Sequence, residues 1–320
     1  MKQKQMKDMK QKQEEVMDRT KAREEAIIKK AQEQMPRLEI KSITVEKNNG
    51  QVHEGISIRR QGDCKSMVLY WPGIWYACGK SCTDAAVVDY ICEKAEEELD
   101  IRLDHERLFK WETARHMIYK KLVNYEKNAD RLESIAHKRY LDLAEVYYMR
   151  ILIPEKEWGM AEVSPKHLEM WGIGMDELEA AASANITPDQ YRLQPMEELL
   201  EDMGVPVCPE KTCMYVLWSS SERFAAAAMT APGLMEQLMG QVGCDCYILP
   251  SSLYELIVCP CKKETDADLL REIVQEVNRN AVRPEDFLSD SVYYCHADTG
   301  KVELCVGEPA QRTDHKQAVG

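Results

Sequence analysis

The sequence has no apolar run that could cross a membrane and no segment that resembles an export signal. No window approaches the roughly 18 uninterrupted apolar residues that a membrane helix requires, and the first residues are charged where a signal peptide is apolar. A surplus of positive charge is also missing, because 55 Asp and Glu residues outnumber 42 Lys and Arg residues. The net charge of −13 repels nucleic acid and anionic lipid. We therefore expect a cytoplasmic protein that binds neither nucleic acid nor a membrane.

The motifs of several enzyme classes are missing as well. Gly172 and Gly174 lack the third glycine and the lysine of a phosphate-binding loop, and no serine stands in a nucleophile-elbow pattern. The chain is rich in cysteine, with 12 residues, but these occur singly within apolar runs. Without an export signal, we expect them to act as small core residues rather than as a disulfide framework.

The composition is that of an ordinary globular protein with a sizeable core. Of 320 residues, 44% are hydrophobic and 30% are charged, and a length of roughly 150 residues per domain suggests about two folded units. The sequence predicts an α+β protein in four parts. These are a charged helical arm at 1–36, an N-terminal α+β domain at 37–205, a C-terminal α+β domain at 206–306 and a mobile tail at 307–320.

The arm is defined by its composition. Residues 1–35 contain neither Gly nor Pro, and their ten Lys and Arg against seven Asp and Glu leave the segment three positive. Such a composition predicts a helix that Pro36 ends. The apolar residues are too sparse for a sustained heptad seam. A simple solvated helix and an arm that binds a partner or a second copy both remain open.

Alternating and helical periods divide the rest of the chain into elements. Asn48-Asn49-Gly50 indicates a hairpin. A helix is expected from His105 to about Asn128, whereas 140–153 is compatible with a strand or a helix. Further expected strands are 38–46, 52–60, 67–71, 214–218, 224–229, 247–249, 253–258, 291–294 and 301–306, with helices at 83–99, 165–171, 175–184, 232–242 and 266–277. The order in the last third indicates an antiparallel sheet with helices on one face.

Four cysteines flank the expected hairpin of the C-terminal domain. Its turn at Leu249 to Ser252 would bring Cys246 beside Cys259 and Cys244 beside Cys261. Four thiolates could then hold zinc, although the usual two-residue spacing of zinc ligands is missing. Core or edge cysteines without a metal are the alternative.

Polar residues of the same region are the candidates for catalysis. A hydrolase could use a group formed by Ser251, Ser252, Glu255, Asn278, Ser289 and Asp290 if the fold gathers them at one edge of the C-terminal sheet. Serines before a strand more often bond their own backbone in a turn. We therefore expect Ser251 and Ser252 to satisfy backbone groups in the turn, with catalysis as the alternative.

Several phrases occur together in an order that resembles one family. They are Lys121–Asn128, Tyr140–Ala144, His167–Gly172, Tyr247–Ser252, Glu276–Asn278, Pro284–Asp286 and Leu288–Tyr293. In this order the chain resembles a bacterial family catalogued as domain of unknown function 5688, over about residues 38–305. The resemblance implies a cytoplasmic bacterial protein and offers no catalytic residues to carry over.

We expect a non-enzymatic interaction protein with an acidic body and a charged N-terminal helix for a partner or for self-association. The alternatives are a hydrolase that uses the Ser, Glu and Asp group and a structural zinc protein that uses the cysteine pairs.

Overall fold

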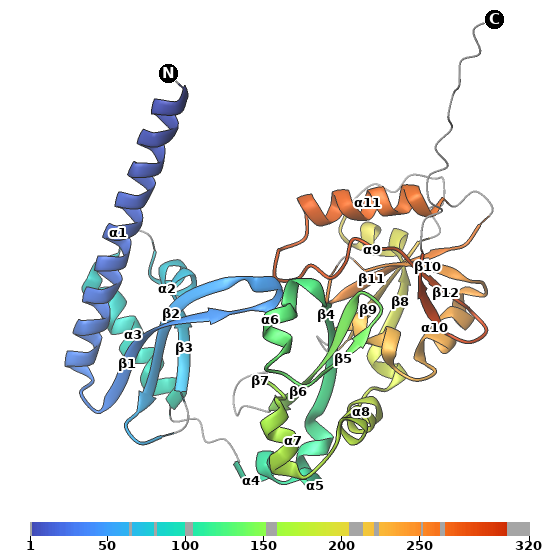
Figure 1. Ribbon diagram of the computed structural model, residues 1–320, viewed down its shortest axis with the longest axis horizontal. Coiled ribbons are helices and arrows are strands. Elements are labelled where there is room, and N and C mark those ends of the chain that lie inside the picture. The colour runs from blue at the N-terminus through green and yellow to red at the C-terminus, as the bar shows by residue number, and fades with distance from the viewer. Residues whose placement is uncertain are drawn as a thin grey trace, which may run out of the picture. The chain divides into compact units, whose positions relative to one another are not determined.

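The computed structural model describes residues 2–63, 66–79, 82–99, 105–151, 159–204, 214–220, 224–250, 252–262 and 266–305. For residues 2–16, 105 and 106 it describes the backbone alone. Ser251 and the tail at 307–320 therefore lie outside the described residues. The described chain is a mixture of helices and antiparallel sheets, as expected (Figure 1). Contacts divide the chain into two compact units, one of 1–47 with 51–103 and one of 48–50 with 104–320.

The first unit packs three helices on a three-stranded antiparallel sheet. Its elements are α1 (Lys2–Gln34), β1 (Leu38–Glu46), β2 (Val52–Arg60), β3 (Ser66–Tyr70), α2 (Trp71–Cys78) and α3 (Asp84–Leu99), and the strand order is β1-β2-β3. Its core joins Ile56 and Ile58 of β2 to Val87 and Ile91 of α3. The apolar residues whose spacing predicts a helix at 83–99 thus form the buried face of α3.

The second half of α1 belongs to this core rather than to a free arm. Ile27 and Ala31 are fully buried, and the Arg23 guanidinium donates to Asp84 Oδ1 at 2.8 Å and to the Cys82 carbonyl at 2.9 Å. Figure 1 shows the amino-terminal half of α1 extending past α2 and α3. The segment 1–36, which the sequence predicts to be an arm, therefore includes residues that belong to the core of the first unit.

The turn of the β1–β2 hairpin, Asn48–Gly50, is grouped with the second unit. Asn49 has a left-handed backbone, with φ of 59°, which Asn tolerates better than most residues. Its side-chain amide donates to the Pro284 carbonyl at 2.8 Å and to the Phe287 carbonyl at 2.7 Å. The Asn-Asn-Gly signal thus marks a turn, and its side chains are also hydrogen-bonding groups.

The second unit contains two antiparallel sheets. The first is formed by β4 (Ile118–Asn124), β5 (His137–Tyr140), β6 (Leu143–Ile151) and β7 (Gly159–Glu162), in the order β4-β6-β5 with β7 on β6. Around it lie the short helices α4 (His105–Phe109), α5 (Trp111–Ala114), α6 (Ala129–Leu132), α7 (Pro165–Trp171) and α8 (Met175–Ala184).

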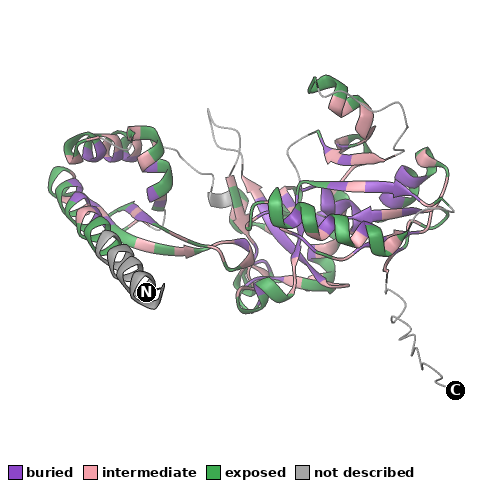
Figure 2. Cartoon of the chain, turned by 90° about the horizontal axis from the view of Figure 1, so that it is seen from above, coloured by how far each residue is buried: buried purple, intermediate pink, exposed green. Residues whose placement is uncertain are grey.

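The second sheet has six strands in the order β13-β12-β10-β11-β9-β8. They are β8 (Tyr191–Pro195), β9 (Tyr215–Ser219), β10 (Cys246–Leu249), β11 (Glu255–Pro260), β12 (Tyr293–Cys295) and β13 (Val302–Leu304). The accompanying helices are α9 (Met196–Asp202), α10 (Leu234–Val242) and α11 (Ala267–Asn280). Figure 2 shows burial concentrated on these strands while the helices carry exposed residues.

Two element predictions are wrong. The helix expected from His105 to Asn128 is interrupted, because Ile118–Asn124 forms β4, a strand whose apolar residues and even Lys120 and Lys121 are buried. The strand expected at 224–229 is a 3-10 turn, Ala225–Thr230, whose alanines are small enough to pack closely within the core.

The six-stranded sheet is covered on both faces rather than on one. Ile248 and Val258 pack against α10, whereas Leu249 and Cys259, one residue further along each strand, pack against α11. The alternation of side chains along a strand explains this division. The core that contains Ile248 also contains Leu122 and Leu143 of the first sheet, so the two sheets share one core.

Candidate functional site

The polar residues expected at a hydrolase site are brought together only in part. Ser252 Oγ accepts from the backbone amides of Tyr254 and Glu255, both at 3.2 Å, in a turn of the kind serine often forms. The Glu255 side chain is exposed. Among the other candidate residues, Asn278 Nδ2 donates to the Ser289 carbonyl at 2.9 Å and to Asp290 Oδ1 at 2.8 Å. Asn278, Ser289 and Asp290 therefore form one group, and Ser252 forms another.

Asp142 is the centre of the hydroxyl network that sequence reasoning missed. Its Oδ2 accepts from Ser289 Oγ at 2.6 Å and from Ser291 Oγ at 3.0 Å, while its Oδ1 accepts from Tyr293 OH at 2.5 Å. Burial, and then the nearby Asp142 carboxylate, raise the pKa of Tyr293. Asp142 lies in Tyr140–Ala144 and its three hydroxyl donors lie in Leu288–Tyr293, two of the segments that carry the family resemblance. The joint occurrence of these segments is the one sequence signal that could have indicated the network.

This network does not resemble an activated nucleophile. Ser289 is only 1% exposed, and its hydroxyl accepts from the Ser291 amide at 2.9 Å while donating to Asp142. A nucleophile requires a reactive oxygen that a substrate can reach. The network therefore satisfies buried polar groups and holds three segments together.

A buried ion pair joins β4 to β6 in the same unit. The side chains of Lys120 and Glu145 are 0% and 4% exposed, with Nζ and Oε2 3.0 Å apart. Lys120 also donates to the Thr230 carbonyl at 2.9 Å and to Ser183 Oγ at 3.3 Å, and Glu145 accepts from the Tyr147 hydroxyl. All three ammonium protons have acceptors, which is the condition for tolerating a buried charge.

The four cysteines of the proposed zinc site do not meet as expected. Cys246 lies opposite Pro260, and Cys259 lies opposite Tyr247, so the register differs by one residue from the predicted one. A shift of one residue turns a side chain to the other face of a sheet, and Cys246 and Cys259 accordingly belong to different cores. Among the described residues, no group of three or more His, Cys, Asp or Glu side chains could hold a metal ion.

The chemistry of the remaining thiols agrees with burial rather than reactivity. Desolvation is the largest cause that raises the pKa of Cys295 to about 11 and that of Cys261 to about 12. Reactive cysteines and metal ligands instead have a lowered pKa. Cys295 belongs to the core of the second unit, whereas Cys261 is half-buried.

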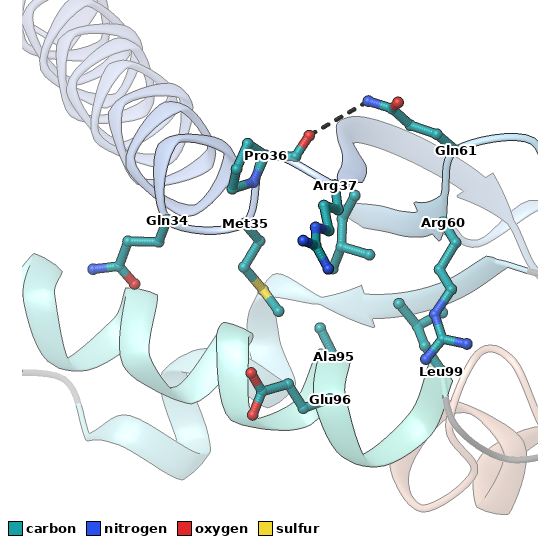
Figure 3. Close-up of a pocket in the computed structure, with 10 residues that line it drawn as sticks. Gln34, Met35, Pro36, Arg37, Arg60, Gln61, Ala95, Glu96 and Leu99 are labelled. Carbon is teal, nitrogen blue, oxygen red and sulfur yellow. Dashed lines mark hydrogen bonds between the residues drawn. The ribbon is translucent and has the colours of Figure 1, made fainter.

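The first unit has a groove at the carboxyl end of α1, where the chain turns into β1 (Figure 3). Its volume is about 670 Å³. We call it the unit 1 groove and define it by the residues that line it, which are Gln34, Met35, Pro36, Arg37, Leu38, Arg60, Gln61, Ala95, Glu96 and Leu99.

The floor of the unit 1 groove is apolar. Leu38, Ala95 and Leu99 are buried residues of the core of the unit, and the Met35 side chain packs against them. Gln61 holds the rim, since its backbone amide donates to the Arg37 carbonyl at 3.4 Å and its side chain to the Pro36 carbonyl at 3.4 Å. The floor of the unit 1 groove is therefore preformed, because core residues of the unit make it up.

Two cations line one side of the unit 1 groove. Figure 3 shows the guanidinium groups of Arg37 and Arg60 reaching from the strand side toward α3, which carries Glu96. The side chain of Arg37 is exposed and has no hydrogen-bond or ion-pair partner among the described residues. Arginine pairs with carboxylates through two parallel hydrogen bonds. The groove thus combines an apolar floor with a positive rim on a protein of net negative charge.

Sequence reasoning did not single out this groove. Leu38 and Arg60 are paired across β1 and β2, but α3 follows only after a further strand and helix. Its residues reach the groove through packing, for which the sequence has no local signal.

Comparisons with known proteins yield one match. Neither a curated protein nor a solved structure matches the chain. Among the helices of the described residues, none combines the length and the apolar character that a membrane crossing requires. The family described as Family of unknown function (DUF5688) matches residues 9–296, which is most of the chain, and the protein belongs to this family.

Proposed function

We propose that this protein is a non-enzymatic interaction module and that the unit 1 groove binds a partner segment in which a carboxylate stands next to an apolar side chain. The single observation behind this proposal is the pair Arg37 and Arg60 beside a floor that contains Leu38 and Leu99. An apolar side chain of the partner would cover the floor, and its carboxylate would bind the guanidinium groups. The partner is therefore an acidic peptide in an extended conformation.

The polar groups of the second unit support a non-enzymatic role. Ser289, the serine nearest to a carboxylate, is buried and bonded on both sides, and Lys120 has three acceptors. These side chains contribute to the stability of the fold, so Arg37, which is exposed and unpaired among the residues that the structure describes, is the better candidate for contact with another molecule.

The test is a binding titration with labelled peptides. A peptide of alternating Leu and Asp residues presents the proposed chemistry, and one of alternating Leu and Asn is its uncharged control. We expect fluorescence anisotropy to show the acidic peptide binding to the full chain about tenfold or more tightly than the control, a difference of about 1.4 kcal/mol.

Charge reversal locates the site. Arg37→Glu combined with Arg60→Glu should weaken binding of the acidic peptide about tenfold or more. Lys29→Glu makes the same kind of charge change at an exposed position on α1 away from the groove, and it should leave the affinity within about twofold. Equal affinity for both peptides, or equal loss in both variants, would show that the groove does not bind this class of partner.

A further inference from the structure

Helix α11 exposes an apolar stripe that its packing does not explain. Leu270 and Val274 fix the helix on the six-stranded sheet, and they are 5% and 3% exposed. On the neighbouring side of the helix, Leu269, Ile273 and Val277 are 55%, 41% and 36% exposed. Residues four apart form one row along a helix. We call these three residues the α11 stripe.

A row of acids borders the α11 stripe. Glu272 and Glu276 lie three residues beyond Leu269 and Ile273, so each acid adjoins a stripe residue. Both acids are exposed, and Asp268 continues their row. Of the nearby cations, Arg271 pairs with Asp268 at the end of this row and also donates to the Cys305 carbonyl, and Arg279 Nε donates to the Gln275 carbonyl at 3.0 Å.

The acids discriminate between the helices that could cover the α11 stripe. A second α11 would place Glu272 and Glu276 of both copies along the same edge, where like charges repel. A helix with a basic edge would instead gain from the acids while its apolar side chains cover the stripe. The charge therefore favours a lysine-rich amphipathic helix.

The chain itself contains a lysine-rich helix. The backbone of α1 is helical from Lys2 onward, and five of its first twelve residues are lysines. Where α1 side chains are described, Met17 is 64% exposed and Arg19 is exposed, whereas Lys21 pairs with Glu54 of β2 at 3.9 Å and Arg23 donates to Asp84. The lysine-rich α1 segment at 2–12 thus has the charge that the α11 stripe would attract.

We propose that the α11 stripe is a self-association surface that takes the amino-terminal half of α1 from a second copy of the chain. This rests on the proposed role as an interaction module but uses a surface other than the unit 1 groove. The contact joins α1 of one copy to α11 of another. Three partly exposed apolar residues and a few exposed charges make a weak contact, with a dissociation constant on the order of 10–100 μM.

The experiment measures the mass of the full chain by sedimentation over a wide concentration range. Wild-type protein should associate reversibly. Ile273→Glu should raise the dissociation constant about tenfold or more, because it buries a charge in the contact. Met170→Glu is the matched control, since Met170 is 43% exposed on α7, and it should leave association unchanged. Circular dichroism checks that both variants are folded.

A charge exchange identifies the second helix. Glu272→Lys with Glu276→Lys should abolish association, and so should Lys7→Glu with Lys10→Glu in α1. A mixture of the two variants should associate again, because each now carries the complement of the other. A wild-type chain that stays monomeric, or one unaffected by Ile273→Glu, would overturn the proposal, and failure of the mixture would exclude α1 as the partner helix. Binding of the acidic peptide to the unit 1 groove should be intact in all of these variants, which separates this proposal from the first.

Discussion

At the scale of single residues, Asp142 links two segments of the second unit that are far apart in sequence. One carboxylate accepts from three hydroxyl groups that are 147 to 151 positions away in sequence. Hydrogen bonds to a charged acceptor contribute about 1.5–3 kcal/mol each, less where the group keeps some contact with water. The carboxylate therefore functions as a tertiary cross-link.

We predict that Asp142→Asn lowers the free energy of unfolding by about 2–4 kcal/mol, because the amide keeps one acceptor oxygen and turns the other into a donor. Urea unfolding followed by tryptophan fluorescence measures this. Asp290→Asn is the control, since Asp290 is exposed and accepts from Asn278 through one oxygen, and it should cost less than about 1 kcal/mol. Equal losses in the free energy of unfolding would show that the Asp142 network contributes no more to stability than the single hydrogen bond of Asp290.

Glu162 gives the second unit a dependence on pH. Burial alone would raise its pKa, but Lys121 and Arg131 outweigh burial and lower the pKa below the usual 4.5. Its side chain is 20% exposed, and its Oε1 lies 3.0 Å from Lys121 Nζ. A lowered pKa stabilises the fold above the unfolded value of 4.5, and that stability disappears as the pH falls through the folded pKa.

We therefore predict that Glu162→Gln costs about 3 kcal/mol at pH 7, because it leaves two largely buried cations without their anion. The difference from wild type should shrink as the pH falls below 4.5, where the wild-type carboxylate also becomes neutral. Denaturant unfolding at pH 7 and at lower pH checks both parts. Glu179→Gln breaks an exposed pair with Lys138 and should cost less than about 1 kcal/mol at either pH.

Sequence reasoning reached single residues unevenly. It grouped Asn278, Ser289 and Asp290, which the structure joins, but it missed Asp142, because nothing local links position 142 to position 289. It also expected a helix from His105 to about Asn128, whereas Lys120 pairs with Glu145 across β4 and β6. A buried lysine cannot be recognised until its anion is placed next to it.

At the scale of elements, Gly55 allows two strands to approach closely. A Cβ atom there would lie 2.4 Å from the Leu69 carbonyl oxygen of β3, closer than atoms can pack. We predict that Gly55→Ala costs about 1–3 kcal/mol, because the β2–β3 pairing must shift. Thermal unfolding measures the change.

Gly240 offers the opposite case within α10. It is exposed, and a Cβ atom there would meet nothing within 4 Å. Gly240→Ala should therefore stabilise the chain by about 0.5–1 kcal/mol through helix propensity. A destabilising effect at Gly240, or a neutral one at Gly55, would contradict the steric explanation.

Elements with strong local signals were predictable. The hairpin around Asn48–Gly50, the helix α3 and the helix opened by Ser164 and Pro165 all form as expected. β4 was missed because its buried residues satisfy a helical period by coincidence, and only pairing with β6 makes it a strand. The predicted pairing of Cys246 with Cys259 is wrong by one residue. The turn between β10 and β11 sets the register of the two strands, and the sequence does not specify the geometry of that turn.

At the scale of the whole molecule, the division into units follows shared cores rather than composition. The charged segment at 1–36 looks separate in sequence, yet its second half completes the core of the first unit. Two buried apolar positions in that half, Ile27 and Ala31, are too few to reveal this in sequence. The unit 1 groove exists because α1 is anchored there.

We predict that Ile27→Ala destabilises the full chain by about 2–4 kcal/mol, because Ile27 is fully buried against β1 and α3. Met17→Ala, at an exposed position on the same helix, should change stability by less than about 0.5 kcal/mol. Chemical denaturation checks both variants. Equal effects would show that α1 packs uniformly or not at all.

The grouping of Asn48–Gly50 with the later part of the chain affects any attempt to divide the gene. A fragment that starts at Asp104 would lack the amide that Pro284 and Phe287 accept from, and Asn128 would lose the Asn49 backbone amide that donates to it at 2.9 Å. A cyclic peptide that displays Asn-Asn-Gly in the same bend could then supply the missing donors from outside. Restored solubility of such a fragment would show that these three residues act as an insert that completes a neighbouring body.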